Sequence, residues 1–237
     1  MDIHSYDNVE EAFPIVKDLF ENKWHTSFEY NYKDMIRFTG SDLPEDISSN
    51  SLFGAYVYYI MTLYDIVAYR SPRDILPMDI VAEAIEWDSN GGQCIYLASL
   101  LYALFLEDKI VKEDQMVFCQ GMYMHMCRED FPMGFLLGGE HSGLHAWIEV
   151  KGAVVDISIR QEEDFFDFKD EPYIMGKVPD GLTMMGYKET KDVAKRYCRD
   201  AAKKANTYYL EWLNKHRIAA HENFLKYLEN ELRSAKG

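Results

Sequence analysis

Three residues of this sequence have the side chains of a thiol acyl-transfer site: Cys94, His145 and Asp156. A cysteine thiolate is a strong nucleophile, a histidine can move its proton, and a carboxylate can fix the orientation of the histidine ring. In such a site the sulfur attacks a carbonyl carbon and a thioester forms. Whether these three residues can act together depends on the elements that carry them.

Cys94 follows a dense loop signal, Asp88-Ser89-Asn90-Gly91-Gly92, and opens an apolar stretch. Residues 93–106 carry no charge, which predicts a helix buried on nearly all sides. A helix N-terminus has free N–H groups and a partial positive charge, which favour a thiolate and can bind an oxyanion. Taken alone, Cys94 would be interpreted as a small core residue, the usual place of a free cysteine.

His145 and Asp156 belong to two predicted strands, 144–150 and 153–158, which the turn signal Lys151-Gly152 joins. With a two-residue turn, the two side chains lie on one face as diagonal neighbours, about 7–8 Å apart by backbone. The carboxylate could then accept one imidazole N–H and leave the other nitrogen for the thiol. A turn one residue longer would separate them onto opposite faces. A hairpin with a merely polar outer face is the competing interpretation.

The same segments resemble the transglutaminase-like family. Gly92-Gln93-Cys94 before an apolar helix resembles its cysteine motif, His145-Ala146-Trp147-Ile148-Glu149-Val150 its histidine motif, and Val155-Asp156-Ile157-Ser158 its aspartate motif, in the family's order. The resemblance covers about 87–160. It implies a papain-like fold and a thioester mechanism, with Cys94 as nucleophile, His145 as base and Asp156 as the group that orients the base.

The sequence departs from the family pattern in two places. The step from His145 to Asp156 is short, and Ala153-Val154-Val155 replaces a strand that usually contains Trp, which suits compact bacterial members. No loop of alternating acidic residues is present, so calcium activation is not expected. We expect neither a metal nor another cofactor.

Four further residues are candidates for the oxyanion site or the substrate cleft: Gln93, Trp87, Trp147 and His141. Gln93 and Trp87 are candidates for the second oxyanion donor, although neither spacing is diagnostic. His141 lies in a glycine-rich loop and could replace His145 as base, but the His-Ala-Trp context favours His145. A solvated loop without a role is equally compatible with His141.

A second cluster, Cys119, His125 and Cys127, could suggest a metal site. The spacing is not of the CxxC type and a fourth ligand is not evident. Cys119 alternates with Val117 on a predicted strand, so packing is the favoured interpretation.

The element order predicts an α+β fold of helices, a small antiparallel sheet and further helices. We expect one domain over 1–237, made of a helical part (1–76), a catalytic core (77–160), and an acidic loop with C-terminal helices (161–237). The predicted segments are a helix from Pro14, a loop over 39–51, a helix over 52–69 with a break at 71–73, a helix over 77–87, a strand over 115–123, loops over 131–143 and 161–172, and helices within 189–235.

The chain carries a net charge of −15, which disfavours nucleic acid and anionic membranes as partners. The N-terminus lacks the pattern of a secretory signal, and four cysteines without one predict reduced thiols in the cytoplasm. The most apolar stretch, Leu52 to Tyr64, has thirteen residues, too few to span a bilayer.

The sequence therefore predicts a thiol enzyme acting on amide or peptide bonds of a protein, a peptide or a small amide. Hydrolysis, as in a cysteine peptidase or amidase, is favoured over transfer to an amine. The alternatives are a catalytically idle interaction protein that keeps the fold, and an acyltransferase of the arylamine N-acetyltransferase type. The acidic loop could select a basic substrate or be merely solvated. The C-terminal helices could mediate dimerisation or cover the core.

Overall fold

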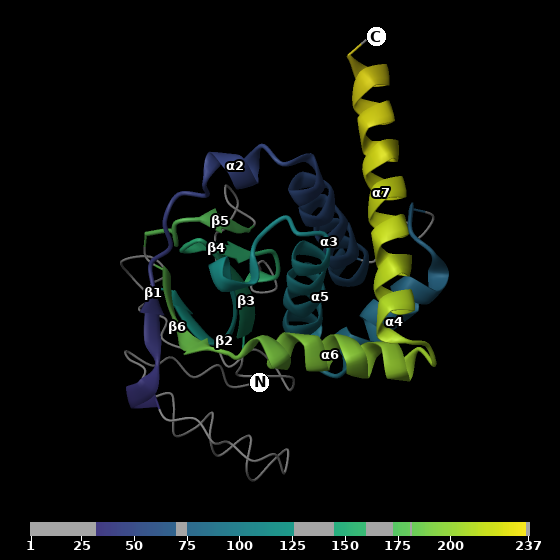
Figure 1. Ribbon diagram of the computed structural model, residues 1–237. Helices are drawn as coiled ribbons and strands as arrows, with labels where there is room; N and C mark the ends of the chain where they lie inside the picture. The colour runs from purple at the N-terminus through teal and green to yellow at the C-terminus, as the bar shows by residue number, and fades with distance from the viewer. Residues whose placement is uncertain (1–31, 70–74, 126–144, 160–172, 181, 236–237) are drawn as a thin grey trace.

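The computed structural model describes residues 32–69, 75–125, 145–159, 173–180 and 182–235. It is an α+β structure in which helices pack against one curled antiparallel sheet (Figure 1), as the element order predicts. The described helices are η2 (Tyr32–Asp34), α2 (Glu45–Ser48), α3 (Ser51–Tyr69), α4 (Met78–Ser89), α5 (Gln93–Glu107), η4 (Glu113–Gln115), α6 (Lys191–Lys204) and α7 (Tyr209–Ser234). The described strands are β1 (Ile36–Phe38), β2 (Met116–His125), β3 (His145–Val150), β4 (Ala153–Asp156), β5 (Ile174–Gly176) and β6 (Leu182–Lys188).

Most predicted elements of the middle and C-terminal parts are confirmed. Helices α3 to α7 and strands β2 to β4 lie where the sequence places them, with ends that differ by a few residues. The predicted loop over 39–51 contains the short helix α2. The remaining predicted segments, which are the helix from Pro14, the break at 71–73 and the loops over 131–143 and 161–172, lie outside the described residues.

The sheet has six strands in the order β1-β6-β2-β3-β4-β5. Three of them were not predicted. β1 lies in the part expected to be helical, and β5 and β6 lie in the part expected to hold a loop and helices. β1 and β5 have only three residues each, too few for a readable alternation. β6 places apolar residues on both of its faces, with Met184 buried and Met185 half-buried, so the polar–apolar alternation of a strand is absent.

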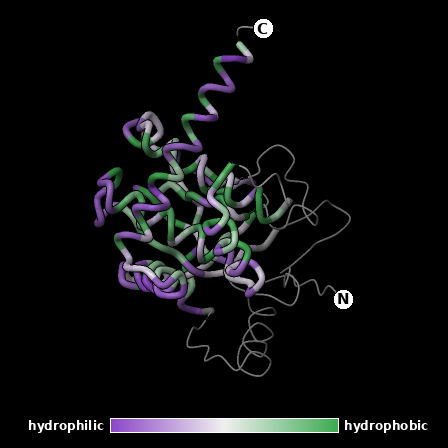
Figure 2. The backbone as a smooth tube through the Cα atoms, turned by 90° about the vertical axis from the view of Figure 1, so that its right-hand side faces the viewer, coloured by the Kyte–Doolittle hydropathy of each residue, from purple (hydrophilic) through white to green (hydrophobic). Residues whose placement is uncertain are grey.

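Two hydrophobic clusters fill the two faces of the sheet. The larger one joins helices α3 to α7 to the face that carries Phe118, Ala146 and Ile148. The smaller one gathers Trp147 and Phe38 on the opposite face. Hydrophobic residues accordingly concentrate in the interior of the tube drawing, whereas the end of α7 alternates in hydropathy (Figure 2). Helix α5, which carries no charge over residues 93–106, packs directly on β3, so the predicted cysteine helix lies against the predicted histidine strand.

Helix α3 contains a segment, Ser51–Ala68, long and apolar enough to cross a membrane by length and composition. Half of that segment is buried within the protein. Its fully buried residues Tyr56, Ile60 and Leu63 belong to the main core, together with residues of α4, α5 and α7. The segment is longer than the thirteen-residue apolar stretch Leu52 to Tyr64, but its packing is that of a core helix. The cytoplasmic location stays a prediction.

The helical layer also encloses a polar cluster. The Trp212 indole N–H donates to both carboxylate oxygens of Glu83, at 2.9 and 3.1 Å. The ring of His216 is fully buried, its Nδ1 lies 2.6 Å from the Tyr59 hydroxyl oxygen, and its Nε2 lies 4.0 Å from Glu83. Burial raises the pKa of Glu83 to about 7 and lowers the pKa of His216 to about 3. Both groups are therefore biased toward their neutral forms.

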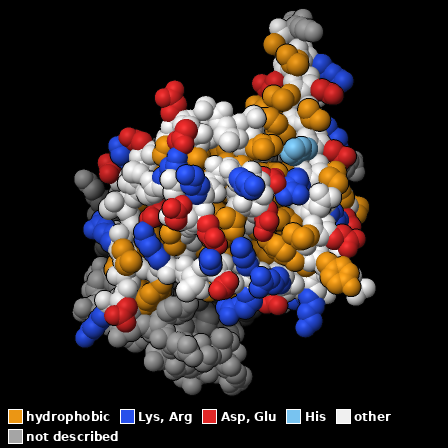
Figure 3. Space-filling model, in the orientation of Figure 1, with side chains coloured by type: hydrophobic (Ala, Val, Ile, Leu, Met, Phe, Trp, Pro, Cys, Tyr) orange, Lys and Arg blue, Asp and Glu red, His pale blue; other side chains and the backbone are white. Residues whose placement is uncertain are grey.

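The surface in Figure 3 mixes acidic and basic side chains, and hydrophobic side chains are exposed among them along the end of α7. Leu225, Leu228 and Leu232 are 60%, 41% and 62% exposed. They follow the three- and four-residue spacing of one helix face.

Candidate active site

The helix that carries Cys94 begins where the sequence predicts. Gly92 precedes α5, and the first intrahelical bond runs from the Tyr96 N–H to the Gly92 carbonyl, 2.9 Å. A Cβ on residue 92 would lie 2.8 Å from the Trp87 ring, so the close approach of α4 to this turn requires glycine. Cys94 is the second residue of the helix. The N–H groups of residues 93–95 lie in the first turn, before the first intrahelical bond.

The hairpin that carries His145 and Asp156 has the short turn on which their pairing depends. Val150 pairs with Ala153, so Lys151-Gly152 is a two-residue turn and this prediction is confirmed. Both turn residues have positive φ, 49° and 86°, as a type I′ hairpin turn requires.

The register brings the imidazole and the carboxylate into direct contact. His145 Nε2 lies 2.5 Å from Asp156 Oδ2, and the two residues are 5% and 1% exposed. In this arrangement the Nε2–H donates to the carboxylate. Nδ1 is then the nitrogen that remains for another partner.

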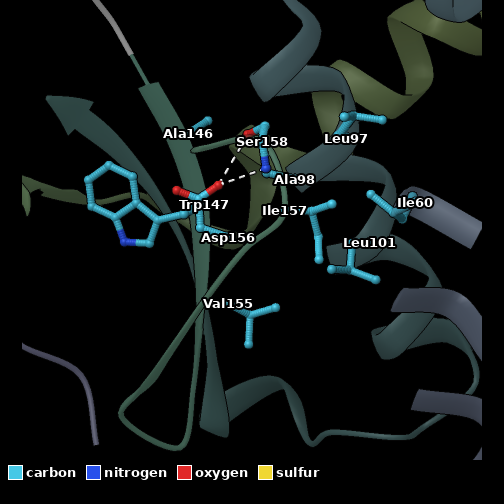
Figure 4. A pocket seen from close by; sticks show the side chains of 10 residues that line it. All are labelled: Ile60, Leu97, Ala98, Leu101, Ala146, Trp147, Val155, Asp156, Ile157 and Ser158. Atoms are coloured by element: carbon cyan, nitrogen blue, oxygen red, sulfur yellow. Dashed lines mark hydrogen bonds between the residues drawn. The ribbon is translucent and has the colours of Figure 1, made fainter. Parts of the chain in front are cut away.

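The other carboxylate oxygen of Asp156 is bound by the residues that directly follow β4. Oδ1 accepts bonds from the Ser158 N–H (3.0 Å), the Ser158 hydroxyl (3.2 Å) and the Ile159 N–H (3.1 Å). Figure 4 shows the two bonds from Ser158 beside the hairpin. Sequence reasoning missed this clamp, although an Asp followed two residues later by Ser is a common local turn signal.

Cys94 completes the constellation. Burial alone would lower the pKa of His145, but Asp156 and then a hydrogen bond and charge interaction with Cys94 raise it above its usual value. The Cys94 side chain therefore lies within hydrogen-bonding reach of the imidazole. The imidazole is therefore placed to accept the thiol proton when Cys94 acts as a nucleophile. The cysteine is 2% exposed, so all three side chains are buried.

Aromatic rings fix the imidazole from two sides. Trp147 stacks on it at 6.0 Å between ring centroids, and Tyr123 meets it edge-on at 5.2 Å. Phe38 packs edge-on against Trp147 at 5.1 Å. Trp147 is fully buried, and its indole nitrogen has no hydrogen-bond partner among the described residues. Its position is that of a packing support for His145.

The gap between the hairpin and the helices is too small for a substrate. Val155 and Ile157 point toward α3 and α5, whereas Trp147 points to the other side of the sheet (Figure 4). The cavity between the hairpin and helices α3 and α5 measures about 10 Å³, roughly the room that one water molecule needs. A substrate would therefore have to approach Cys94 and His145 from another side.

The three other predicted cleft residues differ in position. Gln93 is buried and adjoins Cys94 as the first residue of α5. Trp87 stacks on Tyr96 at 5.7 Å and supports the start of the helix from α4. His141 lies outside the described residues.

The other cysteines have different surroundings. Cys119 is fully buried on β2, in the smaller hydrophobic cluster, and burial raises the pKa of its thiol. Burial also raises the pKa of Cys198 to about 12, and its sulfur donates to the Ser99 carbonyl at 3.3 Å. Cys127 lies outside the described residues, so the predicted absence of a metal at Cys119, His125 and Cys127 stays untested.

Comparison with protein-family models, with curated proteins and with solved structures yields no match. What the site does must be argued from its geometry.

Proposed function

We propose that the chain is a transglutaminase-like thiol enzyme that cleaves amide or peptide bonds through a thioester on Cys94. One observation carries the proposal: the His145–Asp156 bond of 2.5 Å, with Cys94 in contact with the same imidazole at a helix N-terminus. The α+β arrangement, with the cysteine helix on the strand of the histidine, supports a papain-like fold for this site.

In the first half-reaction the Cys94 thiolate attacks the carbonyl carbon of the amide, and an S–C bond forms. The carbonyl π electrons move to oxygen, where the backbone N–H groups at the start of α5 can donate to the oxyanion. The intermediate then collapses, the C–N bond breaks, and the His145 imidazolium gives its proton to the departing amine. A thioester and a free amine result.

In the second half-reaction neutral His145 removes a proton from water, which attacks the thioester carbon. The C–S bond breaks, and the acid and the thiolate–imidazolium pair are restored. An amine in place of water would give transfer. Hydrolysis is favoured because water is always available.

Asp156 acts through His145 in both steps. Its Oδ2 holds the Nε2–H and stabilises the imidazolium, while its Oδ1 is held by Ser158 and Ile159. The substrate is proposed to be a protein, a peptide or a small amide in the cytoplasm. The charge of −15 disfavours nucleic acid and membranes.

One observation favours a second candidate, an interaction protein that keeps the site but performs no chemistry. The Cys94 side chain is 2% exposed, and a nucleophile must be reached by its substrate. The two candidates differ in whether the folded protein can be acylated.

The test treats the protein with p-nitrophenyl acetate. It uses a Cys127→Ser background, because the surroundings of Cys127 are not described and its thiol could react as well. We expect release of p-nitrophenolate and acetylation of Cys94, mapped by mass spectrometry. Cys94→Ser should abolish both signals, whereas Cys119→Ser, which removes another buried thiol, should leave them unchanged. A folded protein whose Cys94 is never acetylated would contradict the enzyme proposal and favour the interaction protein.

A further inference from the structure

Helix α7 buries one of its faces and exposes an apolar stripe on the opposite face. The buried face packs on α3, α5 and α6 and holds Trp212, Leu213, His216, Ala219, Ala220 and Asn223. Successive residues of a helix are turned by about 100°, so Asn223 and Leu232 point in opposite directions. The stripe is made of four apolar side chains that are 41–62% exposed: Ile218, Leu225, Leu228 and Leu232.

The spacing of the stripe is that of a coiled-coil seam. Ile218, Leu225 and Leu232 recur every seven residues, and Leu228 lies three residues after Leu225 and four before Leu232. In heptad terms the first three occupy position a, and Leu228 occupies position d. Side chains at these positions insert between those of a facing helix with the same repeat. The stripe therefore fits a second helix of its own kind.

The end of α7 has no packing of its own to stabilise it. It projects beyond α3 and the sheet (Figure 1), and every residue from Leu228 to Ala235 is exposed. A helix end of this length is marginal in water, because most helical stability in proteins comes from the packing of an apolar face. Leucines at regular intervals on such an end indicate that another helix covers them.

We propose that the stripe pairs with the same stripe of a second copy of this chain, as a parallel two-stranded coiled coil. The stripe points away from the face that packs on α3, so the bodies of the two copies would lie on the outer sides of the seam. This inference is independent of the reaction proposed for Cys94.

The charges beside the stripe favour the parallel direction. Arg217 occupies position g, and Glu222 and Glu229 occupy successive e positions. In a parallel pair, g of one helix faces e of the next heptad on the other, so Arg217 would face Glu222 of the other copy. Arg217 also binds Asp108, and its side chain is 31% exposed. An antiparallel pair would instead bring Glu222 of one copy near Glu229 of the other, and the like charges would repel.

Sedimentation equilibrium of the full chain over about 1–100 μM tests the pairing, because a dimer forms by mass action. The wild-type mass should rise with concentration toward that of two chains. The double variant Leu225→Lys with Leu228→Lys should keep the mass of one chain throughout, with unchanged circular dichroism, since both side chains are exposed in the single copy. The control is Ile36→Lys on β1, another exposed apolar residue at 47%, which should dimerise as the wild type does.

Disulfide formation between introduced thiols tests the direction, in a Cys127→Ser background. Leu232→Cys should give a disulfide-linked dimer under mild oxidation, because a parallel pair brings position 232 of both copies together. The control is Asn230→Cys at position f, which faces away from the seam and should not link.

A wild-type chain that stays monomeric would overturn the proposal and leave the stripe to a different partner. A dimer that survives the leucine substitutions would overturn it as well, because another surface would then hold the copies together. A dimer that the leucine substitutions abolish but that does not link through position 232 would overturn the parallel arrangement.

Discussion

Asp156 divides its two oxygens between two tasks. One is held by Ser158 and Ile159, and the other binds His145 at 2.5 Å. Because the carboxylate is anchored through its own strand end, its orientation does not depend on the imidazole. The histidine is therefore aligned against a fixed acceptor, with Nδ1 left for the sulfur.

Replacing this carboxylate tests the alignment. In Asp156→Asn the amide oxygen can keep the bonds to Ser158 while its NH₂ group faces His145. The imidazole must then accept at Nε2 and carry its proton on Nδ1, so it cannot take the proton of Cys94. We expect alkylation of Cys94 at neutral pH to slow by at least about tenfold, the effect of one pKa unit, with folding largely retained. Unchanged alkylation in a folded variant would remove Asp156 from the site.

The raised pKa of His145 also predicts a pH dependence of stability. Burial opposes the charge, but Asp156 favours it more, so the pKa in the folded protein exceeds the ordinary histidine value of 6.5. The imidazolium–carboxylate pair therefore stabilises the fold fully below pH 6.5, and this contribution is lost as pH rises through the folded pKa. In a Cys94→Ser background, which removes the coupled thiol, we expect the advantage of His145 over His145→Gln to shrink between about pH 5.5 and about pH 10.

Urea unfolding of both proteins at the two pH values measures this difference. Other groups titrate in both proteins alike and cancel in the comparison. A difference in unfolding free energy that stays constant, or grows with pH, would contradict the assigned charge state.

At the scale of elements, the turn at Lys151-Gly152 sets the register of the whole site. Gly152 has φ of +86°, and a Cβ there would lie 3.2 Å from the Ser41 hydroxyl oxygen. Gly152→Ala should lower the free energy of unfolding by about 1–2 kcal/mol, the cost of a left-handed conformation for an L residue. Gly54→Ala is the control, because helix α3 leaves open space at that position and alanine should stabilise it by about 0.5–1 kcal/mol. Equal effects of the two substitutions in urea unfolding would show that the turn carries no strain.

The sequence was sufficient to predict the elements that hold the candidate site. The uncharged run of α5, the glycine turn before Cys94 and the hairpin signal at Lys151-Gly152 are local patterns, and each lies where its pattern predicts. The His145–Asp156 contact follows from the register alone. The contact with Cys94 depends on how α5 packs on β3, which no local pattern contains.

The other strands of the sheet escaped prediction because their pairing joins segments far apart in the sequence. β1 and β6 pair across most of the chain. β1 is too short for a readable alternation and β6 has apolar residues on both faces, so only tertiary packing identifies them as strands. The approach of Tyr197 to Gln120 also joins distant segments, α6 and β2. A sequence pattern can identify a helix face but not the strand that the face will meet.

At the scale of the molecule, the buried cluster around Glu83 makes the helical layer sensitive to pH. Burial raises the pKa of Glu83 from its ordinary value of 4.5 to about 7, although Trp212 and Lys215 act in the opposite direction. The folded protein therefore holds a proton that the unfolded chain releases between these values. Its stability falls as pH rises from 4.5 to 7, by on the order of 3 kcal/mol.

Glu83→Gln should remove this pH dependence, because an amide does not titrate and can still accept from Trp212. Compared with wild type, the variant should become progressively more stable as pH rises from 4.5 to 7 in urea unfolding. The control is Glu86→Gln on the same helix, whose side chain is 57% exposed and pairs with Lys204. A pH dependence that survives in Glu83→Gln would mean that another group holds the proton.

The strand order has a consequence for the sequence of folding events. His145 and Asp156 lie eleven residues apart and meet through a two-residue turn, so their hairpin needs only a small loop to close. The edge strand β1 joins the sheet only when Ile36 pairs with Gly186 on β6, 150 residues later in the chain. Local pairs form faster than distant ones, so the acid–base half of the site can assemble while β6 is still unpaired. During synthesis the ribosome makes the β3–β4 hairpin before it makes β6, the last described strand in the chain. The nascent chain could therefore pair the imidazole of His145 with the carboxylate of Asp156 before the sheet is complete.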